Sequence, residues 1–310
     1  MITITTIKNS LTLSILVSTI IYIIPLKSFS FGNIHPLETS AVTSHTTSFK
    51  NIKGGFLFTK AEVNGQEAWF IVDTGMPGLI LNTKYYKKST YAGQVAGASG
   101  FANLRKIYLD RFYWNGIKLE QFEAMALELS HLEKALGVSI QGLIGMAQFK
   151  HHELLIDYEN NTLTISEPGE NDYRKHKLPR LTLPFRLQAH LPLLKVKIGE
   201  RTFRFGIDTG AASNLISHRK FRKLPIDSYK YLHSKRIHGI NKGTKVSQRI
   251  NIKRTSIANH CFENMPYFVN SLNHLNSQRG IYVDGLLGIP FLSYYKKVSI
   301  SFPERKIYFW

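Results

Sequence analysis

The stretch FGIDTGAASNLIS at residues 205–217 ends an apolar run on an aspartate, which threonine and glycine follow. Residues 70–82, FIVDTGMPGLILN, nearly repeat it. The two stretches align at an offset of 135 residues, which puts Asp73-Thr74-Gly75 on Asp208-Thr209-Gly210. A lone aspartate at the end of a buried strand is costly, because its charged form loses hydration. The repetition therefore indicates that the two aspartates work together.

The repetition extends well beyond the aspartates. Downstream, QGLIGMAQF at residues 141–149 matches VDGLLGIPF at residues 283–291. Each of these glycine motifs is followed by two alternating segments joined by a polar turn, within residues 154–165 and 298–309. Because the parts come in the same order in both halves, the sequence indicates an internal duplication.

Alternating apolar and polar residues, with frequent Val, Ile, Phe and Tyr, predict an all-β fold. Each half begins with two such segments around a turn signal, which predicts a β-hairpin. The turn is Asn64-Gly65 in the first half and Gly199-Glu200 in the second. Helix is expected only in short pieces. These are residues 82–88, 130–136 and 218–223, and the residues after each glycine motif.

The N-terminus has a different composition from the rest of the chain. Residues 11–26, LTLSILVSTIIYIIPL, are almost purely apolar and follow a segment whose only charge is Lys8. Small residues at Ser28 and Ser30 then predict a signal peptide over residues 1–30, with a mature chain that begins near Phe31. The alternative is an uncleaved membrane anchor, although the stretch falls short of the roughly 20 residues that span a bilayer. Both interpretations place the protein outside the cytoplasm, in a periplasm or secreted.

The remaining residues divide into four segments. Residues 31–50 are rich in Ser and Thr and are expected to form a poorly ordered leader. Residues 51–166 form a predicted N-terminal lobe and residues 190–310 a predicted C-terminal lobe. Residues 167–189 are polar, charged and contain Pro and Gly, so they are interpreted as the linker between the lobes.

Composition limits the classes of partner. The net charge is +19, and residues 171–254 hold 21 Lys and Arg against 4 Asp and Glu, which favours contact with an anionic envelope surface. Nucleic acid is not expected, because the charges are scattered and no helix-turn-helix or zinc pattern is present. Cys261 is the only cysteine, so no intrachain disulfide can form. His151-His152 lacks further residues at ligand spacing, and no metal is predicted.

Two facing carboxyl groups have a specific chemistry. At contact distance they cannot both ionise, so they share one proton and titrate as a coupled pair. One carboxylate can then take a proton from a water while the other carboxyl protonates the carbonyl oxygen that the water attacks. This is amide hydrolysis without a covalent intermediate. A duplicated half supplies the two-fold symmetry that such a pair requires.

The two Asp-Thr-Gly motifs and their glycine motifs resemble those of the aspartic proteases. The run GLLGIPFL at residues 285–292, with the strand pair after it, is especially similar to retropepsin-like bacterial members. The resemblance covers residues 54–166 and 190–310. It implies a bilobal all-β fold with two pseudo-symmetric, barrel-like lobes and a central cleft. It also implies an endopeptidase that acts on extended peptides or proteins without a cofactor, and a monomer, because each chain carries both halves.

The resemblance also implies roles for particular residues. Asp73 and Asp208 are expected to be the catalytic pair that holds the water. Four residues are expected to support them: Thr74, Gly75, Thr209 and Gly210. The apolar pairs Leu143-Ile144 and Leu286-Leu287 are expected to pass through the loop around each aspartate. Gly97 in VAGASG and Gly239 in RIHGINKG occupy the place of a mobile hairpin, or flap, that covers the substrate.

Met76 departs from the family pattern, which has Ala, Ser or Thr after the glycine, as Ala211 does in the second half. A long side chain at this place can crowd the aspartates or alter their hydrogen bonds. The departure leaves an alternative function open: a catalytically inactive protein of the same fold that binds a peptide or an envelope component.

Overall fold

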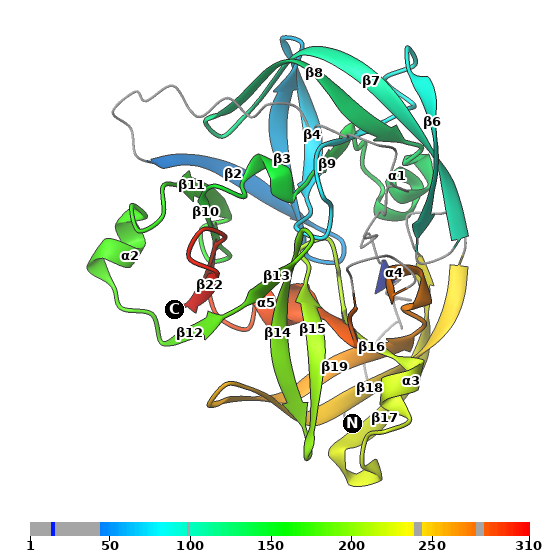
Figure 1. Cartoon of the computed structure of the whole chain (residues 1–310), viewed down its shortest axis with the longest axis vertical. Helices are drawn as coiled ribbons and strands as arrows, with labels where there is room; N and C mark the ends of the chain where they lie inside the picture. Colours follow the sequence, from blue (N-terminus) through cyan, green and yellow to red (C-terminus); the bar gives the residue numbers. More distant parts are fainter. Residues whose placement is uncertain (1–13, 16–43, 98–99, 239–243, 277–281) are drawn as a thin grey trace, which may run out of the picture.

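The computed structural model describes residues 14–15, 44–97, 100–238, 244–276 and 282–310 (Figure 1). The predicted signal peptide and the first part of the predicted leader lie outside the described residues, except for β1 (Ser14–Ile15). This short strand pairs in parallel with a strand of the second lobe. In the described part of the chain, no helix has both the length and the apolar character needed to cross a membrane.

The first lobe is built from one sheet that closes on itself. Its strands run in the order β3-β4-β9-β5-β8-β7-β6, and β3 also pairs with β7. This second pairing makes the sheet barrel-like, because a closed sheet leaves fewer free edges. The strands are β3 (Phe56–Val63), β4 (Gln66–Val72), β5 (Ile80–Asn82), β6 (Thr90–Gly97), β7 (Gly100–Trp114), β8 (Ile117–Leu127) and β9 (Gly142–Ile144).

The second lobe repeats this arrangement strand for strand. Its order is β14-β15-β20-β16-β19-β18-β17, and β14 also pairs with β18. The strands are β14 (Leu191–Ile198), β15 (Arg201–Ile207), β16 (Asn214–Ser217), β17 (Tyr229–His238), β18 (Thr244–Ile257), β19 (His260–Asn270) and β20 (Gly285–Leu287). The predicted bilobal all-β architecture with two barrel-like lobes is confirmed.

The first strands of each lobe form the predicted hairpins. β3 pairs with β4 across Asn64 and Gly65, and both of these residues have positive φ angles, 49° and 81°. Asparagine and glycine tolerate this region best, and such a turn matches the twist of the two strands. The hairpin of β14 and β15 turns at Gly199, where φ is 57°.

All but one of the expected short helices form, and the described residues contain three more that the sequence did not predict. The helical pieces are α1 (Ser130–Leu136), η1 (Met146–Gln148), α2 (Asp172–His176), α3 (His218–Phe221), η2 (Ile226–Ser228), α4 (Asn273–Asn276) and α5 (Ile289–Leu292). The helix predicted for residues 82–88 is wrong. There, Oδ1 of Asn82 accepts hydrogen bonds from the backbone N–H groups of Lys84 and Leu129, so the side chain of Asn82 turns the chain instead.

A third group of strands joins the two lobes. It has the order β12-β22-β21-β10-β11-β2. The closing hairpins of both halves meet in it, because β10 pairs with β21, with Leu154 opposite Ile300. These strands are β2 (Ser44–Ile52), β10 (Glu153–Asp157), β11 (Thr162–Ser166), β12 (Leu181–Pro184), β21 (Lys297–Ser301) and β22 (Lys306–Phe309). The closing segments, which the sequence assigned to separate lobes, therefore share one sheet.

One segment prediction needs correction, and the predicted linker contains regular structure. The leader prediction of residues 31–50 is wrong for residues 44–50, which belong to β2 and pair with β11 and β3. The predicted linker, residues 167–189, contains α2, β12 and β13 (Arg186–Gln188). β12 is not a loose connection, because it forms a ladder with β22.

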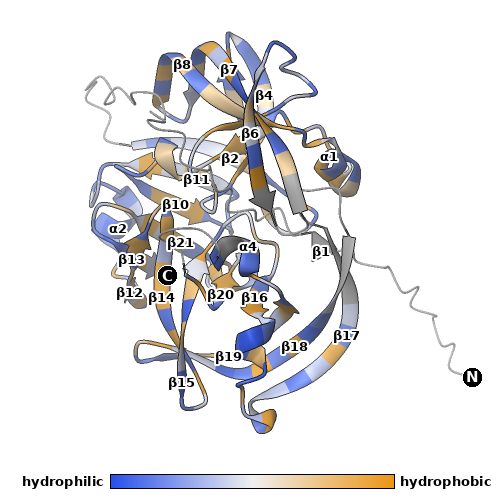
Figure 2. Ribbon diagram, turned by 45° about the vertical axis from the view of Figure 1, so that its right-hand side comes forward, coloured by the Kyte–Doolittle hydropathy of each residue, from blue (hydrophilic) through white to orange (hydrophobic). Residues whose placement is uncertain are grey.

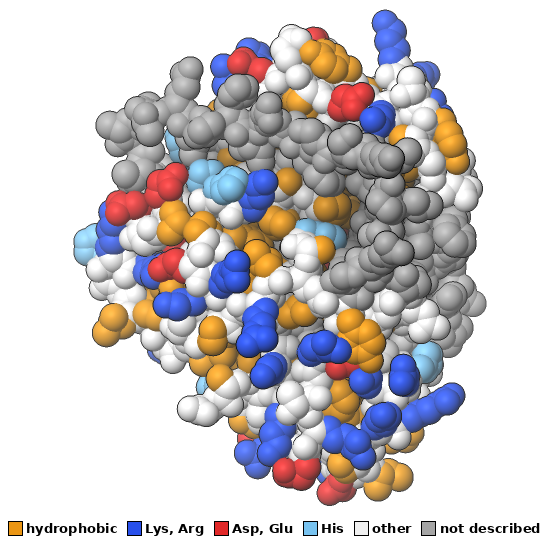
Figure 3. Space-filling model, viewed as in Figure 1, with side chains coloured by type: hydrophobic (Ala, Val, Ile, Leu, Met, Phe, Trp, Pro, Cys, Tyr) orange, Lys and Arg blue, Asp and Glu red, His pale blue; other side chains and the backbone are white. Residues whose placement is uncertain are grey.

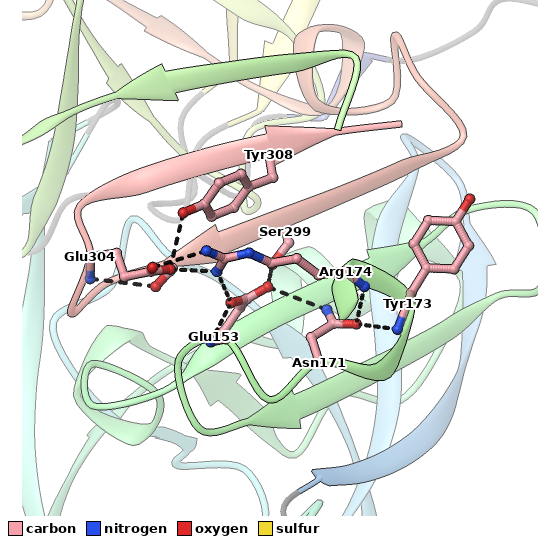
Figure 4. Close-up of polar contacts among 9 residues, drawn as sticks. Glu153, Asn171, Tyr173, Arg174, Ser299, Glu304 and Tyr308 are labelled. Atoms are coloured by element: carbon pink, nitrogen blue, oxygen red, sulfur yellow. Dashed lines mark hydrogen bonds and ion pairs between the residues drawn. The ribbon is translucent and has the colours of Figure 1, made fainter. Parts of the chain in front are cut away.

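The charges of the linker bind it to both halves (Figure 4). Arg174 in α2 donates to Glu153 of β10 at 2.7 Å, and its Nη2 donates to Glu304 at 2.9 Å. Glu153 is fully buried. The hydroxyl of Ser299 in β21 also donates to Glu153. The charged residues of the predicted linker thus form ion pairs with both halves.

The apolar core follows from the alternation of the strands. In Figure 2 hydrophobic and hydrophilic residues alternate along β7, β14 and β18. The largest cluster of buried side chains extends through both lobes and the sheet that joins them, from Phe70 to Phe205 and Ile300. This continuity fixes the two lobes relative to each other, because any shift between them would disturb close packing.

Candidate active site

The two aspartates follow directly after equivalent strands. Asp73 comes after β4, and its backbone N–H donates to the carbonyl of Ile144 at 2.9 Å. Asp208 comes after β15, and its N–H donates to the carbonyl of Leu287 at 3.0 Å. These acceptors belong to β9 and β20, which pair in parallel with β4 and β15. The apolar pairs of the glycine motifs thus hold the backbone of each aspartate.

Each aspartate loop lies against the opposite carboxyl group. Both aspartates are fully buried. A Cβ atom at Gly75 would lie 2.6 Å from Oδ1 of Asp208, and one at Gly210 would overlap the carboxyl group of Asp73. Only glycine at these two places allows the halves to come so close. The structure therefore brings together the two predicted catalytic residues and the two predicted supporting glycines.

The glycines also orient the carboxyl groups. The N–H of Gly75 donates to Oδ1 of Asp73 at 2.9 Å, and the N–H of Gly210 donates to Oδ1 of Asp208 at 2.8 Å. The same local turn forms in both halves, so the two carboxyl groups have matching orientations.

The threonines lock the two loops to each other. The N–H of Thr74 donates to Oγ1 of Thr209 at 2.9 Å, and the N–H of Thr209 donates to Oγ1 of Thr74 at 3.0 Å. Each hydroxyl also donates to the opposite strand: Thr209 to the carbonyl of Val72 at 2.9 Å and Thr74 to that of Ile207 at 3.4 Å. Both threonines are fully buried, so these bonds do not compete with water.

Burial and mutual repulsion dominate the electrostatics of the pair. Burial, the charge of Asp208 and a side-chain hydrogen bond with Asp208 raise the pKa of Asp73 well above its ordinary value of 3.8. The backbone N–H groups of Gly75 and Met76 oppose this rise. The pair therefore holds one proton at a pH where an isolated aspartate would have lost it.

Met76, the departure from the family pattern, packs into the core of the first lobe. Its fully buried side chain belongs to an apolar cluster with Phe58, Ile71 and Ile80. The carbonyl of Met76 accepts from the N–H of Met146 at 2.8 Å, as that of Ala211 accepts from Ile289 at 2.8 Å. The backbone thus follows the same path in both halves despite the longer side chain.

Only one of the two predicted flap glycines, Gly97, lies within the described residues. Gly97 ends β6 and is paired with Gly100 of β7, next to the turn of that hairpin. Gly239 lies outside the described residues. The strands beside it, β17 and β18, pair up to His238 opposite Thr244. Their contact with substrate stays a prediction.

Sequence reasoning missed His190, which reaches the site from the second half. It follows β13, and its Nε2 forms a hydrogen bond of 3.0 Å with the carbonyl of Gly75. Burial lowers the pKa of His190 to about 4, although the bond to Gly75 opposes this shift. No local signal marks His190, because no motif surrounds it and the 135-residue offset puts Gly55 opposite it.

The described residues contain no group of three or more His, Cys, Asp or Glu side chains that lies together so as to hold a metal ion.

Comparison with known proteins identifies the family. The model of the aspartyl protease family matches twice, at residues 59–147 and at residues 194–291, which together make up more than half of the chain. Each match contains one of the Asp-Thr-Gly motifs and both glycines of the glycine motif that follows it. No curated protein matches the chain. The chain thus belongs to the aspartyl protease family, with two retropepsin-like lobes in a single polypeptide.

Proposed function

We propose that the protein is an aspartic endopeptidase in which Asp73 and Asp208 activate a water molecule. One observation carries this proposal: two buried carboxyl groups face each other across Gly75 and Gly210, in equivalent loops. The raised pKa of Asp73 supports a shared proton in this pair.

The reaction follows from one proton on two carboxyl groups. The ionised carboxyl takes a proton from water, whose oxygen bonds to the peptide carbonyl carbon. The protonated carboxyl gives its proton to the carbonyl oxygen, so that a neutral diol forms. The first carboxyl then protonates the leaving nitrogen, the C–N bond breaks, and the second carboxyl recovers a proton from the diol. The pair returns to its starting state with one proton.

The proposed substrate is an extended peptide or protein. Long hairpins, β6–β7 and β17–β18, extend from equivalent places in both lobes. A peptide between them would bind by main-chain hydrogen bonds, as strand addition does, with side pockets for selectivity. Gly97 and Gly239 are the proposed flap positions.

Peptide cleavage by site variants tests the proposal. Asp73→Asn and Asp208→Asn are expected to abolish cleavage of a diverse peptide library between acid and neutral pH, while Asp227→Asn, an exposed control, keeps it. A pepstatin-type transition-state mimic should inhibit the unaltered protein. Cleavage that survives in Asp208→Asn would refute the assignment. Peptides that bind but stay whole would instead favour the inactive binding protein.

We also propose that the chain is exported and that the second lobe contacts an anionic envelope surface. Lys and Arg gather on this lobe, in the lower half of Figure 3. Four exposed cations of this region lie close in sequence: Arg219, Arg222, Lys223 and Lys230. Replacing all four with Gln should weaken sedimentation with phosphatidylglycerol vesicles and leave that with phosphatidylcholine vesicles unchanged. Equal sedimentation of both proteins with anionic vesicles would contradict the proposal.

A further inference from the structure

The paired site is nearly symmetric, and His190 is one side chain that breaks the symmetry. It immediately precedes β14, just as Gly55 precedes the equivalent strand β3. Glycine has no side chain, so the first half cannot make the matching contact. His190 is partly buried and forms its bond with the carbonyl of Gly75 in the opposite half.

The bond to His190 anchors the backbone of Gly75 on its carbonyl side. The N–H of Gly75 donates to Oδ1 of Asp73 at 2.9 Å, while its carbonyl accepts from Nε2 of His190 at 3.0 Å. A tilt of this glycine would move the N–H that orients the carboxyl group. The imidazole thus acts on Asp73 through one residue.

A rigid path connects His190 to the second aspartate. Leu191, the next residue, is fully buried and packs against Gly206, where any Cβ atom would overlap it. β14 pairs with β15, with Leu193 opposite Gly206, two residues before Asp208. The position of the imidazole is therefore fixed by the same strands that place Asp208.

The hydrogen bond also defines the state of the imidazole. A carbonyl oxygen only accepts, so Nε2 carries the hydrogen. Burial keeps the ring neutral above about pH 4. His190 is therefore a neutral donor that orients Gly75 without adding a charge beside the two carboxyl groups.

We propose that His190 is a positioning residue, which holds the Gly75 peptide from the opposite lobe and so sets the orientation of Asp73 relative to Asp208. This inference rests on the proposed peptidase function. The bond from His190 makes the surroundings of the two aspartates unequal, although their loops have the same sequence motif.

Two variants separate the hydrogen bond from mere packing. His190→Gln places an amide N–H near the position of Nε2, whereas His190→Leu has similar bulk and no donor. Because small misplacements at a catalytic site are costly in rate, we expect kcat to fall roughly tenfold or more in the Leu variant. KM should change far less, and the Gln variant should stay within about threefold of the unaltered kcat. His233→Leu, at an exposed histidine of the same lobe, is the control.

Amide hydrogen exchange of Gly75 provides a readout that does not need activity. The N–H of Gly75 should exchange faster in His190→Leu than in His190→Gln, because only the latter keeps the peptide anchored. The inference would be overturned if His190→Leu and His190→Gln had the same kcat and the same exchange rate of the Gly75 N–H. This holds whether both variants match the unaltered protein or both lose activity to the same extent. If the unaltered protein cleaves no peptide, the proposed function fails, while the exchange measurement still decides the role of His190.

Discussion

The hydroxyl of Thr209 offers the sharpest test of how the two halves are held together. Thr209→Val keeps the shape of the side chain and removes its oxygen. That oxygen accepts from the N–H of Thr74 at 2.9 Å and donates to the carbonyl of Val72 at 2.9 Å. Thr209 and Thr74 are both fully buried, so water cannot replace the lost partner without entering the core.

The expected cost follows from these two bonds. Leaving the buried N–H of Thr74 without an acceptor costs about 1–3 kcal/mol, and the lost bond to Val72 costs about 1 kcal/mol. Thr209→Val should therefore destabilise the protein by about 2–4 kcal/mol. Thr209→Ser keeps both bonds and loses one buried methyl group, worth about 1 kcal/mol. Thr74→Val should cost less than Thr209→Val, because its bond to Ile207 is longer, 3.4 Å.

Urea unfolding followed by circular dichroism measures these differences. With a slope of about 3 kcal/mol per molar urea, Thr209→Val should unfold at about 1 M less urea than the unaltered protein. The Ser variant should lie close to the unaltered protein. If the Val and Ser variants unfold at the same urea concentration, the exchanged hydrogen bonds do not hold the halves together and the reasoning fails.

Three further predictions concern the same region. Gly210→Ala should abolish peptide cleavage with little change in circular dichroism, because the new methyl group would displace the carboxyl group of Asp73; normal turnover in a cleavage assay would count against the close approach. Met76→Ala should lower the free energy of unfolding by about 2–5 kcal/mol through a core cavity and still cleave peptides; a stable but inactive variant would contradict this. Between pH 6.5 and about 4 the unfolded chain gains a proton that folded His190 does not, so the free energy of unfolding should fall by up to about 3 kcal/mol as the pH drops. In His190→Gln, urea titrations at the two pH values should show a smaller fall in the free energy of unfolding. An equal fall in this variant and in the unaltered protein would refute the prediction.

The residues of the candidate pair could be predicted because their signals are local and repeated. Asn64-Gly65 specifies a hairpin turn through its own backbone preferences. The apolar runs before Asp73 and Asp208 indicate buried strands, and the duplication places the two aspartates at equivalent positions. Each inference needed only neighbouring residues and one alignment of the two halves.

The parts that could not be predicted depend on contacts between distant segments. Residues 44–50 contain few apolar residues, and they form a strand only because β11 and β3 offer free edges. The bond from His190 to Gly75 joins residues 115 positions apart, and no local pattern marks either end. Alternation shows which residues face a core, but it does not show which strand becomes the neighbour.

The sheet between the lobes explains how the site keeps its symmetry although the halves have diverged. Each half ends in a hairpin, and the pairing of β10 with β21 joins these hairpins into one sheet. Arg174 then connects buried Glu153 of the first half with Glu304 of the second, and this bond to Arg174 lowers the pKa of Glu304 to about 2. Because Glu304 stays ionised down to about that pH, the ion pair persists in acid. The raised pKa of Asp73 means that Asp73 keeps its proton in part of the same acidic range. The bonds that align the two aspartates are therefore expected to hold over the pH range in which the pair shares its proton.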